Sequence, residues 1–449
     1  MSRPERLSAR QFLDLVTDPG TFAGIPHRER RPAPDGPLGW QGYDASRARA
    51  AERTGERESV VVGTARVGGT AAVLIAFEFG YLGGSLGERT GDRLEAAYAH
   101  ARAHRLPVVP LIATGGSRMQ EGMLALTQLQ RVARQSALTR EARLPQVAVV
   151  RDPTTGGGWA TLGAGADVIL ALPGAQVGFA GSRVRPPDAD PAAYTAEAQL
   201  AAGAADAVVP PAELRDCLGL WLRLLTRPAP EPAEPPAALG RTGLPGTGWV
   251  AVQHARDPRR PRAGAYLDAY FTRRAALVGD RCGGADPDGM LCGFGERDGR
   301  TVAFAAQTGT ATRPAGFRTA ARLIRLADRL GIPVLTLVDT PGAANDAEAE
   351  RQGAGAAIAD LFGVLAAART PVTTLVIGEG GSGGALALAA PGNTWATPDS
   401  YFSVIAPEPA AAILKRPPEA AEATADHLRI RPQDLVELGV IRGIVTAAP

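Results

Sequence analysis

Cysteine is scarce in this 449-residue sequence. Its three cysteines, Cys217, Cys282 and Cys292, are too few and too scattered for a disulfide framework or a four-thiolate zinc site. Because reduced thiols suit a reducing compartment, we expect a cytoplasmic protein that holds no metal.

A charge excess and long apolar runs are also missing. The net charge is +2 and no basic run alternates with aromatic residues, so nucleic acid is not an expected partner. The apolar stretches are of strand length or are interrupted by glycine and proline, which argues against a membrane helix. The first residues, MSRPERLSARQF, lack the apolar core of a signal peptide.

Histidine is rare, and no Ser–His–Asp order stands out. The five histidines lie away from the glycine-rich stretches described below: His27, His100, His104, His254 and His427. A side chain that would serve as a nucleophile or general base is therefore not evident, and the chemistry has to be sought in backbone groups.

Glycine, in contrast, is concentrated at Gly378–Ala385, with the sequence GEGGSGGA. This stretch follows an apolar run typical of a strand, Pro371–Ile377, and precedes a helix expected over Leu386–Ala390. Glycines between a strand and a helix expose backbone N–H groups at the helix start, where they are able to stabilise an oxyanion. A tight turn that merely requires glycine is the alternative interpretation.

A second copy of this pattern lies 226 residues earlier. Leu144–Val150 is an apolar run that leads into RDPTTGGGWAT at Arg151–Thr161. The same offset relates Pro107 to Pro333, Thr114 to Thr340, Gly116 to Gly342, Pro145 to Pro371, Gly157 to Gly383 and Gly158 to Gly384. The register predicts an internal duplication, with two glycine turns in each half.

The chain length favours two to three domains. Strand, glycine turn and helix alternate in both halves, which predicts α/β domains over residues 1–226 and 248–449. Residues 227–247 are rich in proline and predict an extended tether between the halves.

The motifs resemble the carboxyltransferase component of acyl-CoA carboxylases, in the crotonase superfamily. The first half is similar to the bacterial β subunit at TGGSRMQEG (114–122), DPTTGG (152–157) and GFAG (178–181). The second half is similar to the α subunit at VQHARDPRRP (252–261), GDR (279–281), VDTPGA (338–343), IGEGGSGGALAL (377–388) and PEAAE (418–422). The resemblance covers nearly the whole chain and implies two tandem crotonase-like domains.

The resemblance also implies a reaction. Acyl-CoA would bind to the first half and carboxybiotin, on a separate carrier protein that biotin carboxylase loads, to the second. Carboxybiotin loses CO2 to give a biotin enolate, which removes the α-proton of the thioester, and the thioester enolate captures the CO2. Two enolates require two oxyanion holes, which gives a physical reason for the doubled glycine loops. The family pairs the first half of one chain with the second half of another, so we expect a homo-oligomer.

By position, the resemblance assigns residues to each site. The thioester hole would use Gly156 and Gly157, with help from Gly115 and Gly116. The biotin hole would use Gly383, Gly384 and Ala385, with Gly342 nearby. The CoA thioester would meet Arg118, Gly178, Phe179, Ala180 and Gly181. A Gly384→Val change is expected to impair the rate far more than folding.

Several features depart from the family pattern. The zinc ribbon usual in the β subunit is absent, so no structural zinc is expected. Thr308 replaces a usual lysine, residues 344–346 replace Tyr-Pro-Gly, and Pro409 replaces a glycine. Trp159 stands where the family has a small residue, and it would either narrow the acyl pocket or pack in a core.

These departures leave two further readings open. A biotin-independent relative would decarboxylate a malonyl-type thioester, carried on CoA or on a carrier protein. In a non-enzymatic scaffold, the glycine loops would survive only as fold elements.

Overall fold

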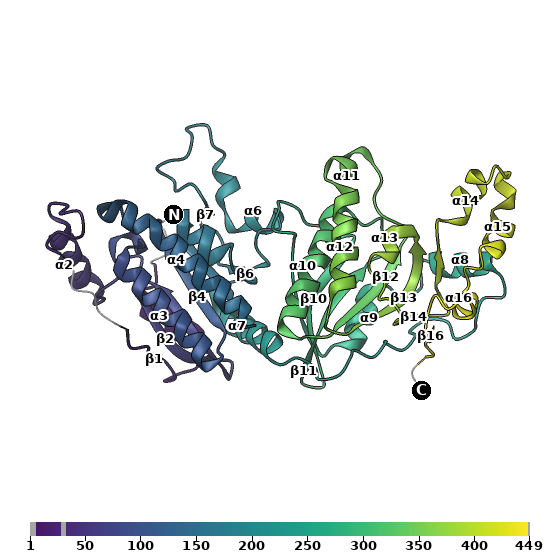
Figure 1. The fold of residues 1–449 in the computed structure, drawn as a ribbon, viewed down its shortest axis with the longest axis horizontal. Helices are drawn as coiled ribbons and strands as arrows, with labels where there is room; N and C mark the ends of the chain where they lie inside the picture. Colours follow the sequence, from purple (N-terminus) through teal and green to yellow (C-terminus); the bar gives the residue numbers. More distant parts are fainter. Residues whose placement is uncertain (1–5, 28–32, 448–449) are drawn as a thin grey trace. The chain divides into compact units, whose positions relative to one another are not determined.

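A computed structural model describes residues 6–27 and 33–447 of the chain. The chain divides into two compact units, one extending to Thr226 and the other beginning at Arg227 (Figure 1). Each unit contains an eight-stranded sheet with helices packed on it. The predicted α/β class is therefore confirmed. No helix among the described residues is long and apolar enough to cross a membrane.

The first unit has the strand order β1-β2-β3-β4-β5-β6-β8, and β7 also pairs with β5. Its strands are β1 (Ala23–Gly24), β2 (Val60–Val67), β3 (Thr70–Phe77), β4 (Val108–Thr114), β5 (Val147–Thr155), β6 (Val168–Ala171), β7 (Val177–Gly178) and β8 (Ala207–Val208). Its helices are α1 (Ala9–Val16), α2 (Tyr43–Thr54), α3 (Glu88–His104), α4 (Gly122–Glu141), α5 (Gly156–Gly158), α6 (Ala196–Ala201) and α7 (Pro211–Thr226). From β3 onward the pairing is parallel.

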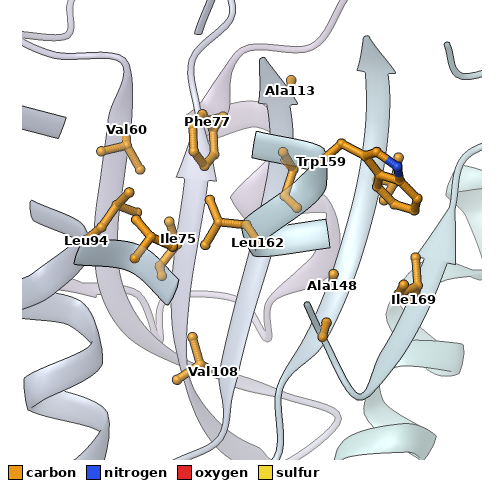
Figure 2. Packing of buried hydrophobic residues seen from close by; sticks show 14 of the residues in the cluster. Val60, Ile75, Phe77, Leu94, Val108, Ala113, Ala148, Trp159, Leu162 and Ile169 are labelled. Carbon is orange, nitrogen blue, oxygen red and sulfur yellow. The ribbon is translucent and has the colours of Figure 1, made fainter. Parts of the chain in front are cut away.

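Burial on both faces explains the composition of the central strands. All seven residues of β4, VVPLIAT, are buried, which is typical of a parallel strand covered on both sides. Figure 2 shows side chains of β3, α3 and neighbouring elements packed together, including Ile75, Phe77 and Leu94.

The second unit has the order β16-β14-β13-β12-β11-β10-β9, and β15 also pairs with β13. Its strands are β9 (Arg273–Ala276), β10 (Met290–Arg297), β11 (Arg300–Gln307), β12 (Val334–Thr340), β13 (Val372–Gly381), β14 (Thr394–Ala396), β15 (Tyr401–Ser403) and β16 (Gly443–Ile444). Its helices are α8 (Gly248–Arg256), α9 (Ala263–Tyr270), α10 (Pro314–Leu330), α11 (Ala347–Arg351), α12 (Ala354–Ala367), α13 (Ser382–Leu386), α14 (Pro407–Ile413), α15 (Ala421–His427) and α16 (Pro432–Glu437).

The strand registers of the two units repeat at the predicted offset. β4 and β5 change register between Ile112 and Thr114, where Thr114 pairs with Thr154. β12 and β13 change register between Val338 and Thr340, where Thr340 pairs with Gly380. Each position in the second unit lies 226 residues after its counterpart. An irregularity reproduced at equivalent positions supports the internal duplication.

The proline-rich segment 227–247 requires a correction. It forms no helix or strand of its own before α8, as expected, but Ala233 and Ala238 are buried in the core of the second unit. The Thr373 hydroxyl donates to the Ala233 carbonyl at 2.6 Å, and the Tyr270 hydroxyl donates to the Glu234 carbonyl at 3.0 Å. The segment therefore packs along this unit and is not a free tether.

Candidate active site

The first glycine site consists of Gly115, Gly116, Gly156 and Gly157. β4 and β5 are parallel neighbours, so their carboxyl ends bring the two glycine turns together. A Cβ atom at Gly156 would lie 3.2 Å from the Cα atom of Gly116, and both residues have positive φ, +62° and +110°. Glycine is needed here both for the close approach of the two turns and for the backbone conformation.

The N–H groups of this site are not equally available. Gly115 donates to the Gly83 carbonyl at 2.9 Å, and Gly156 donates to the Phe179 carbonyl at 3.0 Å. Gly116 donates to the Thr114 hydroxyl at 3.0 Å. Gly157 lies at the start of α5, where N–H groups have no acceptor within the helix. The geometry therefore favours Gly157 as the donor, and the other three glycines hold the turns in place.

The second glycine site consists of Gly342, Gly383, Gly384 and Ala385. Gly342 donates to the Thr340 hydroxyl at 3.1 Å, which repeats the bond of Gly116. Ser382, at the position equivalent to Gly156, has the same left-handed backbone with φ of +59°. A Cβ atom at Gly384 would collide with the backbone nitrogen of Ala343, so these two turns also touch.

Gly383 is the most accessible member of this site. It is exposed at the start of α13, and a Cβ atom there would meet no atom within 4 Å. Its N–H group has no acceptor within the helix. Next to it lies a cavity of about 420 Å³ with a mainly apolar lining: Ser382, Gly383, Leu386, Phe402, Ser403, Val404, Leu428, Arg429, Leu435, Leu438 and Val440.

A buried ion-paired carboxylate, Asp339, stabilises the strands that carry the second site. The Asp339 carboxylate, at the end of β12, accepts from Arg260 at 2.5 Å and from Arg262 at 3.2 Å. It also accepts the N–H group of Glu379 at 3.1 Å. Because Asp339 is fully buried, these bonds are needed to keep its charge inside, and they tie the end of β12 to β13.

A second ion-paired group flanks the same loop. Arg256 contacts Glu379 at 2.9 Å, and the Tyr401 hydroxyl donates to the same carboxylate at 2.8 Å. Burial and the neighbouring Glu379 charge raise the pKa of Tyr401, so the phenol remains protonated at neutral pH. The Glu379 carboxylate is thereby held in place by two donors.

Arg118 does not have the position that was expected of a residue that meets the CoA thioester. Its side chain is 1% exposed and contacts Glu58 at 2.5 Å. It also bonds to the hydroxyl groups of Tyr43 and Ser85, at 3.2 and 3.1 Å. Burial is the largest influence and acts to raise the pKa of Glu58, but the charge and hydrogen bonds of Arg118, together with the N–H group of Ser59 and the charge of Arg89, hold the pKa below its usual value. Arg118 is a buried structural residue, because its donors are directed to interior acceptors.

The GFAG segment lies beside the first glycine site. Gly178 ends β7 and is buried, whereas Phe179 is 74% exposed and only its carbonyl group is bonded to Gly156. Ala180 and Gly181 are half-buried. The structure therefore brings these four residues to the predicted site.

Trp159 is part of the core of the first unit. It is 8% exposed and begins the π-helical turn Trp159–Gly163 (Figure 2). A Cβ atom at Gly163 would lie 2.5 Å from the indole, so this glycine makes room for the ring. Of the two expectations for Trp159, core packing is the one that the structure supports.

Gln307 was not identified from the sequence. It is fully buried at the end of β11, and its Nε2 atom donates to the Gly384 carbonyl at 3.0 Å. A glutamine that ends an apolar strand just before Thr-Gly-Thr is the only signal in the sequence, and the glycine pattern does not reveal it.

Two family models match the chain. Residues 39–224 match the carboxyl transferase domain, and residues 246–448 match the model described as acetyl co-enzyme A carboxylase carboxyltransferase-like. The "acetyl-coenzyme A carboxylase carboxyl transferase subunits beta/alpha" of Salinispora arenicola (strain CNS-205) is 39% identical, with 98% of this chain and 82% of that protein covered. The chain belongs to the acetyl-CoA carboxylase carboxyltransferase family.

One further relative agrees with this assignment, and one solved structure shares the fold. The "probable biotin-dependent acyl-coenzyme A carboxylase beta3 subunit" of Mycobacterium bovis (strain ATCC BAA-935 / AF2122/97) is 33% identical, with 99% of this chain and 90% of that protein covered. A crystal structure of transcarboxylase 12S has a TM-score of 0.80 at 20% identity, covering 98% of this chain and 87% of that chain, and so shares the fold.

These findings confirm the resemblance to fused β-like and α-like halves and the crotonase-like fold. They also confirm the enzyme class, an acyl-CoA carboxylase carboxyltransferase. The relatives give no support to a malonyl-thioester decarboxylase.

Proposed function

We propose that the two glycine sites are the two oxyanion holes of one carboxyl transfer from carboxybiotin to an acyl-CoA. The observation that carries this proposal is the repeated geometry: in each unit, a glycine at a helix start has an N–H group with no acceptor within its helix, beside a second glycine turn. A single-substrate hydrolase would need one such site, whereas carboxyl transfer forms negative charge on two substrates.

The first site is assigned to the thioester. The Gly157 N–H group would donate to the thioester carbonyl oxygen as the α-carbon loses its proton, so the enolate forms against a fixed dipole. The GFAG segment, with Phe179 exposed, would form the wall along which the pantetheine arm lies. Since Arg118 is buried, exposed arginines such as Arg183 are better placed to meet CoA phosphates.

The second site is assigned to the ureido oxygen of biotin. Gly383 is exposed, and its N–H group has no acceptor within α13. The apolar cavity of about 420 Å³ beside it suits a small fused ring, so the residues present fit this group. When bound, carboxybiotin supplies the CO2 and the base. The chain's own contribution is to orient the ring, exclude water with Leu386, Phe402 and Val404, and neutralise the ureido oxygen.

We further propose that the active protein is a homo-oligomer that works with a separate biotin carrier protein and a biotin carboxylase. Apolar side chains beside both glycine sites are exposed, with Met119 and Phe179 each at 74% and Val404 at 72%. Exposed apolar surface at a catalytic site is typical of an interface, and a second copy of the chain would cover it.

The proposal is tested by incubating the purified chain with malonyl-CoA and following the CoA thioesters by mass spectrometry. Conversion to acetyl-CoA only when free biotin is added, with carboxybiotin as the second product, is the expected result. Loss of CO2 from malonyl-CoA without biotin, surviving avidin treatment, would contradict it and favour the decarboxylase.

A further inference from the structure

The short helix α13 leaves one carbonyl group of the second glycine site without its helical partner. In a regular helix, the Gly384 carbonyl would accept from the N–H group of Leu388. Here the Leu388 N–H donates to the Ala385 carbonyl at 3.2 Å, because the chain tightens into a turn after α13. A buried carbonyl group without a donor is costly, so its partner is a structural requirement of the site.

Gln307 provides that partner from another strand. Its Nε2 atom donates to the Gly384 carbonyl at 3.0 Å and contacts the Thr312 hydroxyl at 3.3 Å. The amide orientation is set by the first bond, because a carbonyl group accepts and so faces the NH2 group. Among the described residues, the Oε1 atom of Gln307 is buried and has no partner.

The same amide also reaches the other turn of the site. Thr312 donates its N–H group to the Gly342 carbonyl at 3.2 Å and accepts the N–H group of Ala344 at 2.9 Å. Gln307 therefore links the turn that contains Gly342 to the turn that contains Gly384. In the first unit the corresponding strand, β3, ends in Phe77, whose side chain has no hydrogen-bond donor.

We propose that Gln307 is a positioning residue for carboxyl transfer, which holds the Gly384–Ala385 peptide so that the N–H groups at the start of α13 face the bound ureido oxygen. This inference rests on the function proposed above for the second glycine site. Gln307 does not touch either substrate, since it is fully buried. It acts through the peptide whose carbonyl group it binds.

The test compares Gln307→Met with Gln146→Met. Both changes replace a buried glutamine amide by an apolar side chain of similar size. Gln146 bonds to Ser136 through both amide atoms and precedes β5, at the end of that strand opposite the first glycine site. The control therefore reports the cost of losing a buried amide that supports neither site.

Two measurements are made on each full-length variant. Hydrogen exchange of residues 378–390 without any ligand is expected to be at least about tenfold faster in Gln307→Met alone, since a local bond is lost. The kcat for transfer from malonyl-CoA to free biotin is expected to fall by at least about tenfold in Gln307→Met, with the KM for malonyl-CoA unchanged.

Each outcome bears on a definite claim. Unchanged local exchange, or a kcat loss no greater than that of Gln146→Met, would overturn the positioning role. A wild-type chain that exchanges slowly at residues 378–390 but shows no biotin-dependent transfer would overturn the proposed function of the site instead. Faster local exchange together with the selective kcat loss would support both.

Discussion

The two units contain the same pair of glycine turns, but the turns differ in how exposed they are. In the first, Leu129 of α4 packs directly on Gly157, which is buried. In the second, the residue 226 positions later is Gly355, nothing lies against it, and Gly383 is exposed beside an apolar cavity. The duplicated turns supply the donors, whereas the residue at position 129 of α4 and its counterpart at position 355 of α12 differ.

The buried charges beneath the two sites also differ. The first unit uses Arg118 with Glu58, and the second uses Arg260 with Asp339. Neither group has a counterpart at the 226-residue offset, since Ala344 and Ala113 occupy the equivalent positions of Arg118 and Asp339. The two units therefore share the backbone geometry of the glycine turns, whereas the buried ion pairs beside these turns are not equivalent.

The largest effect is expected for Gly384→Ala. Its Cβ atom would collide with the Ala343 backbone, which cannot move aside as a side chain would, so both transfer activity and folding of the second unit are lost. The expectation from sequence, that a side chain at Gly384 would impair the rate far more than folding, is therefore wrong, because the Cβ atom would overlap the backbone nitrogen of Ala343. Urea unfolding and kcat measure it, with Gly363→Ala, on an open face of α12, as a control that retains both.

Removing the buried charge of the first unit is expected to have the next largest effect. The Arg118 side chain is 1% exposed, and in Glu58→Gln the more distant Glu121, at 3.5 Å, would be the carboxylate left to pair with it. This variant should lose about 3–5 kcal/mol of unfolding free energy. The control Asp360→Asn breaks the exposed pair with Arg325 and should cost about 0–1 kcal/mol. Equal losses in the two variants, measured by urea unfolding, would refute the structural role of Arg118.

Trp159→Ala separates core packing from acyl selection. The cavity left in the core of the first unit should cost about 3 kcal/mol. Since the indole packs in the core, the ratio of kcat/KM for malonyl-CoA and ethylmalonyl-CoA as carboxyl donors to biotin should not change. A marked shift of this ratio toward the longer substrate would instead show that Trp159 limits the acyl pocket.

Gly355→Leu should make the second site resemble the first. Leucine is a better helix former than glycine, but Gly355 is only the second residue of α12, so the free energy of unfolding should rise by less than about 0.8 kcal/mol. If the 226-residue offset holds in space, the side chain would lie over Gly383 as Leu129 lies over Gly157. A several-fold higher KM for free biotin at an unchanged KM for malonyl-CoA is the expected result. An unchanged KM for biotin would show that position 355 of α12 does not cover the second site as Leu129 of α4 covers the first.

Local patterns predicted the fold class and the duplication, because glycine turns and apolar strands are determined by residues close together in the sequence. The strand expected at Pro371–Ile377 overlaps the observed β13 for the same reason, whereas α13 ends at Leu386, where the helix was expected to begin. The side-chain supports could not be predicted, because they join residues far apart in the sequence, such as Arg118 with Glu58 and Gln307 with Gly384. The bond from Gly156 to Phe179 likewise decides which N–H group is free, and no local pattern reveals it.

The most direct test of the two-hole account is the Gly383→Ala variant. Its Cβ atom would meet nothing within 4 Å of the folded chain, so the unfolding midpoint should not fall. The added methyl group would stand where the ureido oxygen approaches, so kcat for biotin-dependent transfer should drop by about tenfold or more, while the Kd for malonyl-CoA stays unchanged. Full transfer activity in a stably folded Gly383→Ala variant would contradict the account.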